Sequence, residues 1–133
     1  MYGYSSVSIS SGATTGGSGS STNNNTSSHV VVGQICSIGV TYNGSPPSST
    51  DVVIATAGNN GPALTILTLT NANSNGWFHP RHKIDDESAV DVTYDGTNEV
   101  YDKVCVADNI KITVSQANDD DSVDVVVVYY AGA

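Results

Sequence analysis

The sequence predicts an all-β protein: a sandwich of two antiparallel sheets, of the jelly-roll kind. Three observations predict this fold class. Runs rich in Val, Ile, Thr and Tyr recur after residue 28, and clusters of Gly, Asn, Pro, Asp and Ser separate them. Several of these runs alternate between apolar and polar residues. No segment of 10 or more residues combines the 3.6-residue apolar spacing of a helix with capping residues.

Residues 1–28 predict an extended N-terminal arm outside the sandwich. Ser, Gly, Thr and Asn dominate this segment, which contains no Asp, Glu, Lys or Arg. By itself it buries too little apolar area to offset the conformational entropy lost on ordering. It is either a flexible tail or an arm that becomes ordered on a partner, and we favour the second. The anchors of such an arm would be Tyr2, Tyr4, Val7 and Ile9.

Residues 29–133 predict the sandwich domain. The expected strands cover residues 29–42, 51–56, 63–71, 78–84, 89–95, 99–107, 109–116 and 122–130. The first of these strands contains Gly33 and Gly39, and a bend is expected at one of the two.

Alternation within two of the strands indicates a sheet with one buried and one solvated face. In residues 89–95, the side chains of Val90, Val92 and Tyr94 share one face, which we expect to be buried. In residues 109–116, the side chains of Ile110, Ile112 and Val114 share one face in the same way.

Two other strands depart from simple alternation. Residues 63–71 change phase between Ile66 and Leu67, which indicates a bulge or burial on both faces. Residues 123–130 are apolar on both faces. We therefore expect one face of this last strand to lie against the second sheet, and the other against another subunit or the N-terminal arm.

The charge and hydropathy of the chain exclude two classes of partner. The formal net charge is −9 and the pI is about 4.2, so the protein repels phosphate backbones and is not expected to bind nucleic acid. The longest apolar run, residues 125–131, is far shorter than the roughly 20 residues of a membrane helix. The N-terminus lacks the basic and apolar regions of a secretory signal, so we expect neither a membrane partner nor secretion.

Cys36 and Cys105 each lie in an apolar stretch that is typical of a strand. We expect buried, reduced thiols, with a single cross-sheet disulfide as the alternative. Two cysteines without a CxxC motif do not make a zinc site.

The rarest residues of the chain gather in GWFHPRHKIDDES, residues 76–88. His79 and His82 with Asp85 or Asp86 could be metal ligands. However, a spacing of three on a strand points the two imidazoles to opposite faces, and a turn at the intervening proline would be needed to bring them together. Residues 118–122, NDDDS, could bind calcium but lie between two strong strand patterns, so we expect a solvated hairpin loop. We predict no metal and no cofactor.

Motifs of nucleophilic catalysis and of nucleotide binding are absent from the sequence, which contains no G-x-S-x-G, Walker A, G-x-G-x-x-G or H-E-x-x-H. The chain is therefore not expected to be an enzyme. Trp77, Phe78 and Arg81 are residue types that anchor protein interfaces. The alternative is that the two aromatic rings fill the core, and both interpretations hold if one ring points inward and the other outward.

Three segments resemble the small capsid decoration, or cement, proteins of tailed bacteriophages. They are the aromatic–Pro–Arg element of Trp77, Phe78, Pro80 and Arg81, the segment VCVADNIKITVSQ (residues 104–116), and the closing strand SVDVVVVYY (residues 122–130). Together with the polar segment between them, they cover about half of the chain. The sequence departs from the pattern by placing His79 before the proline, and by using NDDDS where a Gly-rich hairpin is commoner.

This resemblance implies a jelly-roll homo-oligomer, a dimer or trimer, that binds the major capsid protein on the outer surface of the virion and is assembled in the host cytoplasm. It implies no catalysis. The candidate partner-binding residues are Tyr2, Tyr4, Trp77, Phe78, Arg81 and Tyr130.

Two other functions remain open from the residues themselves. One is a carbohydrate- or receptor-binding sandwich of a fibre or tail, in which exposed aromatic rings stack on sugars; its candidates are Trp77, Tyr94, Tyr101 and Tyr130. The other, which ranks last, is a metal-dependent hydrolase that uses His79, His82 and Asp85.

Overall fold

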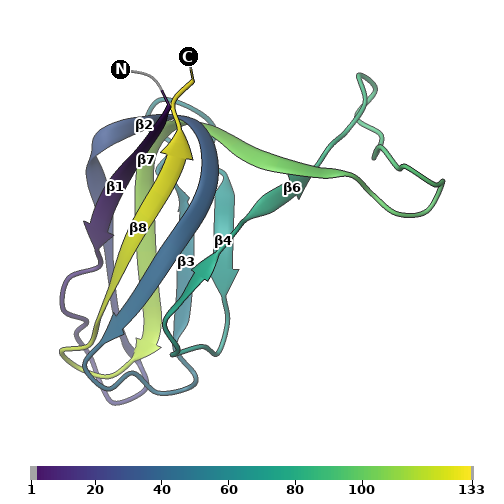
Figure 1. Ribbon diagram of the computed structural model, residues 1–133. Helices are drawn as coiled ribbons and strands as arrows, with labels where there is room; N and C mark the ends of the chain where they lie inside the picture. The colour runs from purple at the N-terminus through teal and green to yellow at the C-terminus, as the bar shows by residue number, and fades with distance from the viewer. Residues whose placement is uncertain (1–2, 133) are drawn as a thin grey trace.

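A computed structural model describes residues 3–132, which contain eight strands and no helix (Figure 1). The strands are β1 (Tyr4–Ser10), β2 (Ser21–Asn43), β3 (Asp51–Thr56), β4 (Thr65–Leu69), β5 (Gly76–Phe78), β6 (Arg81–Lys83), β7 (Tyr101–Ala117) and β8 (Ser122–Tyr130). All strand pairs are antiparallel. The described residues include no helix long and apolar enough to cross a membrane.

The strand order is β1-β8-β2-β7-β3-β4, with β5 added to β2 and β6 to β7. In Figure 1, β1, β8 and the last part of β2 form the front layer, and β7, β3 and β4 lie behind them. We refer to the front layer, with β5, as the first sheet and to the rear layer as the second sheet. The two-layered antiparallel sandwich is thus confirmed. The jelly-roll winding, the finer part of that prediction, is not confirmed by this strand order.

Strand β2 belongs to both sheets. Its first part, up to Ile35, pairs with β7, and residues 34–43 pair with β8. The strand therefore passes from one layer to the other near Gly33, one of the two positions where a bend was predicted. Gly33 has a φ of 145°, and a Cβ atom there would collide with the carbonyl oxygen of Tyr130. Only glycine fits both requirements.

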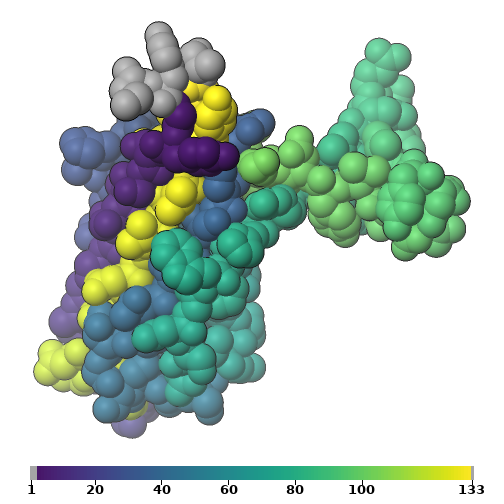
Figure 2. Space-filling model, in the orientation of Figure 1, coloured from purple at the N-terminus to yellow at the C-terminus, as the bar shows by residue number. Residues whose placement is uncertain are grey.

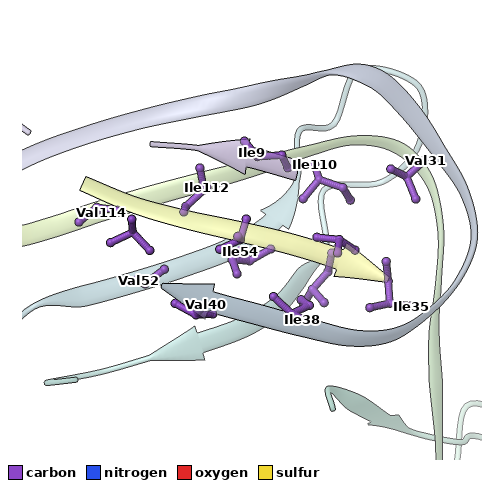
Figure 3. Close-up of a cluster of buried hydrophobic side chains, with 14 of the residues drawn as sticks. Ile9, Val31, Ile35, Ile38, Val40, Val52, Ile54, Ile110, Ile112 and Val114 are labelled. Atoms are coloured by element: carbon purple, nitrogen blue, oxygen red, sulfur yellow. The ribbon is translucent and has the colours of Figure 1, made fainter. Parts of the chain in front are cut away.

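The core lies between the layers and is made almost entirely of Ile and Val (Figure 3). Every second residue of the long strands enters it, as strand alternation requires. Ile110, Ile112 and Val114 of β7 are fully buried, which confirms the predicted face of that strand. A register shift beside Leu67 in the β3–β4 ladder confirms the predicted irregularity at Ile66.

The N-terminal segment is not a separate arm from Tyr4 onward, and this corrects the predicted domain boundary at residue 28. Residues 4–10 form β1, which pairs along its whole length with β8. Residues 21–28 begin β2 and pair with β7. The segment joins the sandwich because Ile9 is buried in the core, and Val7 packs against it. Most of its polar residues are exposed or half-buried, and the four buried ones, Ser11, Thr14, Ser21 and Ser27, donate their hydroxyls to backbone carbonyl oxygens.

The strand predictions need three further corrections. Residues 99–107 and 109–116 are one strand, β7, because Asp108 stays within the ladder. The expected strand 78–84 is interrupted by His79 and Pro80: β5 ends at Phe78 and β6 begins at Arg81. Residues 89–95 contribute only isolated bridges, and the face predicted to be buried is not: Val90 is 58% and Tyr94 73% exposed, and Val92 is half-buried.

Asp121 closes the end of the sandwich opposite the bend of β2. Its buried carboxylate accepts hydrogen bonds from the amides of Ser45 (2.8 Å) and Asn118 (2.9 Å). Its carbonyl oxygen accepts from the amide and the hydroxyl of Thr14. The NDDDS segment is thus a hairpin turn, as predicted, but its third Asp is buried and joins three loops.

Candidate interaction surfaces

Trp77 and Phe78 point to opposite sides of the first sheet. They belong to β5, an edge strand paired with residues 38–40 of β2. The Phe78 ring packs against the core, whereas Trp77 is 60% exposed. This arrangement confirms that one ring points inward and the other outward.

The Trp77 indole lies over Gly39, its partner in the ladder. A Cβ atom at Gly39 would meet three carbons of the benzo ring at 2.9–3.0 Å. The absence of a side chain at Gly39 therefore lets the indole lie against the backbone of the sheet. A hollow of about 280 Å³ beside the ring is lined by Gly39, Trp77 and Val126, among others.

The residues of β1, β8, β2 and β5 that point away from the core form a surface that we call the outer face, viewed from the front in Figure 2. The register of the strands assigns to it Tyr4, Ser6, Ser8, Ser37, Gly39, Trp77, Val126, Val128 and Tyr130. Tyr4 and Tyr130 lie side by side, with ring centroids 5.2 Å apart. The same register places the exposed carboxylate of Asp124 on this face, two residues from Val126 and at the end of β8 away from Tyr130.

Arg81 and His79 border the outer face. Nδ1 of His79 lies 3.0 Å from the Ser37 hydroxyl oxygen. Nη1 of Arg81 donates to the carbonyl oxygens of Cys36 (3.2 Å) and Pro80 (2.8 Å). Within residues 3–132, Arg81 makes no ion pair. Its charge is therefore free to meet a partner.

Three of the six predicted partner-binding residues, Tyr4, Trp77 and Tyr130, share the outer face, and Arg81 borders it. Phe78 is separated from them because it faces the core. Tyr2 lies outside the described residues. The three predicted metal ligands are not brought together: His79 contacts Ser37, and His82 pairs with Asp102 in the β6–β7 ladder. No group of three His, Cys, Asp or Glu side chains suited to a metal occurs in residues 3–132.

Residues 81–103 leave the sandwich as a long extension, which we call the projection (Figures 1 and 2). At its base, β6 pairs with residues 101–103 of β7. All hydrogen bonds that residues 84–100 make within the described chain are with other residues of the projection. The outer part of the projection therefore holds its own shape without support from the sandwich.

Three short segments, residues 83–85, 91–93 and 99–101, meet in the projection. Their central residues are joined by a closed ring of backbone hydrogen bonds: Ile84 donates to Val100 (3.0 Å), Val100 to Val92 (3.0 Å) and Val92 to Ile84 (2.9 Å). Each segment thus pairs with both of the others. We call this unit the three-segment junction.

Two Asp-stabilised turns connect the three segments. The Asp86 carboxylate accepts hydrogen bonds from the amides of Ser88 (2.7 Å) and Val90 (3.1 Å). The Asp95 carboxylate accepts from the amides of Asn98 (2.7 Å) and Thr97 (2.9 Å), and also from the Asn98 side chain. The backbone and side-chain donors of Asn98 lower the pKa of Asp95, because they favour its charged form.

One face of the junction is charged. Nζ of Lys83 lies 3.0 Å from Glu99 and 3.3 Å from Asp91, so one cation joins all three segments. The hydrogen bond that Lys83 donates to Glu99, followed by the one that it donates to Asp91, raises the pKa of Lys83. The carboxylate of Glu99 has its pKa lowered by the same contact with Lys83.

The opposite face of the junction is apolar. Ile84, Val92 and Val100 lie there, because strand alternation places each of them opposite the charged residue that precedes it. Val90 and Tyr94 flank Val92 on the same face and are largely exposed. The three central residues, by contrast, are half-buried.

The sequence contains a signal for this junction that pattern analysis missed. Ile84, Val92 and Val100 are spaced by eight residues, and so are Lys83, Asp91 and Glu99. The two intervening turns begin with Asp86 and Asp95. A search for alternating strands interprets such a segment as two ordinary strands and finds no repeat.

The two cysteines are free, but the prediction that they are buried is wrong: Cys36 is half-buried and Cys105 exposed. Cys105 contributes to a hollow of about 370 Å³ at the base of the projection, which also contains Ile66, Arg81 and Val104. The thiol is exposed because Cys105 lies between Val104 and Val106, which are both buried, so strand alternation points its side chain away from the core.

Comparisons with known proteins do not show a family for this chain. No protein-family model matches it, and no curated protein matches it. A solved structure described as the crystal structure of FLHE aligns with 96% of this chain and 98% of its own, at 12% sequence identity and a TM-score of 0.45. A likeness at this level supports no conclusion about function.

Proposed function

We propose that this protein is a non-catalytic structural component of a virus particle, a decoration protein that binds the outside of a phage head and stabilises contacts between capsid subunits. The observation that carries the proposal is the apolar face of the projection, on which Val90 and Tyr94 are exposed. Apolar side chains gathered on one face of an extended unit gain free energy only when a partner covers them. A projection that keeps its own hydrogen bonds presents that face without first having to fold.

Other features support attachment to a large assembly. The acidic, polar remainder of the surface favours solubility on an exterior exposed to water. Residues 77–81, 104–116 and 122–130 resemble capsid decoration proteins, and this resemblance indicates that the partner is the major capsid protein. Many copies on one shell would add avidity to a modest single contact.

The test uses phage heads assembled without this chain. Purified protein is added, bound protein is measured by co-sedimentation, and the heads are heated until they release DNA. The wild-type protein should bind and raise the release temperature. A variant in which Asn-Gly replaces residues 85–99 should keep the strand spectrum of the sandwich in circular dichroism but bind more weakly. Heads that are equally stable with and without the wild-type protein would contradict the proposal.

A carbohydrate-binding role is a second candidate, favoured by the position of Trp77. An exposed indole held flat on a sheet by Gly39, with hydroxyl side chains nearby, is a surface on which a sugar ring can stack. Glycan-array binding by the wild-type protein that disappears in Trp77→Ala, with head binding unchanged, would favour this role. Absence of binding to any glycan would eliminate it.

A further inference from the structure

We infer that the open edge of β7 beside Lys103 and Cys105 takes up an extended segment of a partner polypeptide as an added strand. The segment places an aliphatic side chain in the hollow at the base of the projection and, directly after it, an acidic side chain beside Lys103. This site uses neither the apolar face of the projection nor the outer face. It does not depend on the proposed function, because β7 and its neighbours define it by themselves.

One edge of β7 has no strand partner over residues 103–107 of the described chain. β2 pairs with residues 104–109 along one edge, and β3 pairs with residues 110–115 along the other. Past the end of β3, this second edge carries one further backbone bond, from the amide of Ala57 to the carbonyl oxygen of Asn109 (2.8 Å). β7 continues beyond that point into the projection (Figure 1), so the lane that β3 follows is open beside residues 103–107.

β6 does not fill this lane. It pairs with residues 101–103, and the bond from the amide of Ile84 to the carbonyl of Val100 shows that the even-numbered residues face it. Even- and odd-numbered residues of a strand direct their backbone groups to opposite edges. The even-numbered residues of β7 also face β2, since the hydroxyl of Thr22 donates to the carbonyl of Val114. β6 and β2 therefore share one edge, and β6 begins where β2 leaves it.

The odd-numbered residues of β7 direct their backbone groups to the open edge. A Cβ atom on Gly61 would lie 3.4 Å from the carbonyl oxygen of Ala107, so the loop after β3 already stands beside that residue. The amide of Lys103 donates to the neighbouring Asp102 carboxylate (2.7 Å) instead of to a strand. Both backbone groups of Cys105 and the carbonyl of Lys103 are thus available to an added strand, which gains affinity from main-chain hydrogen bonds.

The hollow of about 370 Å³ at the base of the projection opens onto this edge. Its apolar lining includes Leu64, Ile66 and Val104. A second hollow of about 230 Å³ shares Leu64 and Cys105 with the first and reaches along the edge to Ala107. Residues directly opposite each other in a ladder point to the same face. Since Val104 points inward and is buried, the residue opposite it in an added strand directs its side chain into the hollow, where an aliphatic group fits.

Lys103 determines which charge the added strand carries. It is half-buried and lies directly opposite Arg81 in the β6–β7 ladder, and neither cation forms an ion pair within the described residues. Like charges directly opposite each other destabilise a ladder, and opposite charges stabilise it. An antiparallel segment whose aliphatic residue lies opposite Val104 places its next residue opposite Lys103. An acidic side chain there offsets the repulsion by Arg81, whereas a lysine on an open edge deters other strands.

Hydrogen exchange followed by NMR on the full purified chain tests the edge. In the free protein the amide of Cys105 should exchange faster than those of Val104 and Val106, which face β2. The probes are heptapeptides blocked at both ends, Ser-Thr-Val-Thr-Leu-Asp-Ser and its variants with Ile or Val in place of Leu. At about ten times its Kd, such a peptide should slow exchange of the Cys105 amide about tenfold and leave the other two amides unchanged.

A peptide of the same composition tests the order of the two side chains. Ser-Thr-Val-Thr-Asp-Leu-Ser, in which the acidic residue precedes the aliphatic one, should bind more weakly than the first probe. It directs its carboxylate into the apolar hollow when its backbone pairs in the same register, and burial of an unpaired charge is unfavourable.

A charge exchange tests the contact with Lys103. Lys103→Glu should weaken binding of the first probe by about fivefold and should bind a peptide with Lys in place of Asp more tightly than the wild type does. Lys111→Glu is the matched control, because Lys111 lies on the same strand where both edges are paired. It should bind the first probe as the wild type does. Amide spectra like that of the wild type establish that each variant is folded.

Three results would overturn the site: a Cys105 amide that is as protected as that of Val104 in the free protein, no slowing of its exchange by any probe up to the solubility limit, or binding that ignores the order or the charge of the peptide. The proposed function is judged separately, by head binding. A protein that takes up the peptide but not heads overturns only the proposed function, whereas one that binds heads but no peptide overturns only the added strand.

Discussion

Trp77 and Phe78 follow each other in β5, so their side chains point to opposite faces of the first sheet. Phe78 packs against the core, and Trp77 covers the position where Gly39 has no side chain. Aromatic side chains contribute to stability mainly through the area that they bury. The two neighbours therefore differ in what their removal should cost.

Phe78→Ala should lower the free energy of unfolding by about 2–4 kcal/mol, because it opens a cavity beside the core. Trp77→Ala should lower it by about 1 kcal/mol or less, since most of the indole is already in contact with water. Urea denaturation followed by circular dichroism measures both. An unfolded Trp77→Ala variant would mean that the indole is part of the core.

The long strand β7 remains continuous through a buried acidic residue, Asp108. Its carboxylate accepts hydrogen bonds from the amides of Gly58 (2.7 Å), Asn109 (2.8 Å), Asn59 (3.2 Å) and Asn60 (3.2 Å). The side chain thereby holds the loop between β3 and β4 against β7. Burial by itself would raise the pKa of Asp108, but the four amide donors outweigh it, and the net pKa is lowered.

Asp108→Asn should lower the melting temperature at neutral pH, because an amide cannot accept these four hydrogen bonds as a carboxylate does. A lowered folded-state pKa means that the carboxylate stabilises the protein above its ordinary pKa of about 3.9. That contribution is lost as the pH falls through the folded-state value. Thermal melts from pH 7 downward should therefore show that the difference in melting temperature between wild type and variant becomes smaller below about pH 4. A difference in melting temperature that is the same at every pH would contradict this role.

The whole molecule depends on β2, which supplies strands to both layers and turns between them near Gly33. No loop separates the two parts of β2, so one continuous strand connects the two sheets. The sandwich then needs a residue at the turn that combines a positive φ with close approach to the carbonyl of Tyr130.

Gly33→Ala should destabilise the whole sandwich by about 2–4 kcal/mol, since it adds a steric collision to the strain of a positive φ. Gly96→Ala is the matched control. Gly96 has a φ of 82°, but no atom lies within 4 Å of the position that its Cβ would occupy, so only strain of about 1 kcal/mol is expected. Thermal unfolding of both variants measures the difference. If both variants lose the same free energy of unfolding, the close approach of Gly33 to the carbonyl of Tyr130 does not restrict which residue the turn accepts.

The sequence by itself determined the fold class, because strand alternation reports directly which side chains face a core. Ile110, Ile112 and Val114 were assigned to the buried face from their spacing, and the structure places them there. The opposite orientations of Trp77 and Phe78 follow from the same rule. Such inferences hold because a period of two is a local property of a strand.

The tertiary structure alone decided what each strand pairs with and which apolar face remains uncovered. Residues 4–10 carry too few apolar side chains to order by themselves, and they became β1 only because β8 offers a free edge. Val90, Val92 and Tyr94 alternate as a buried strand does, yet they lie on a projection with no sheet behind them. Pairing and burial are contacts between distant segments, and local spacing cannot specify which distant segment will be there.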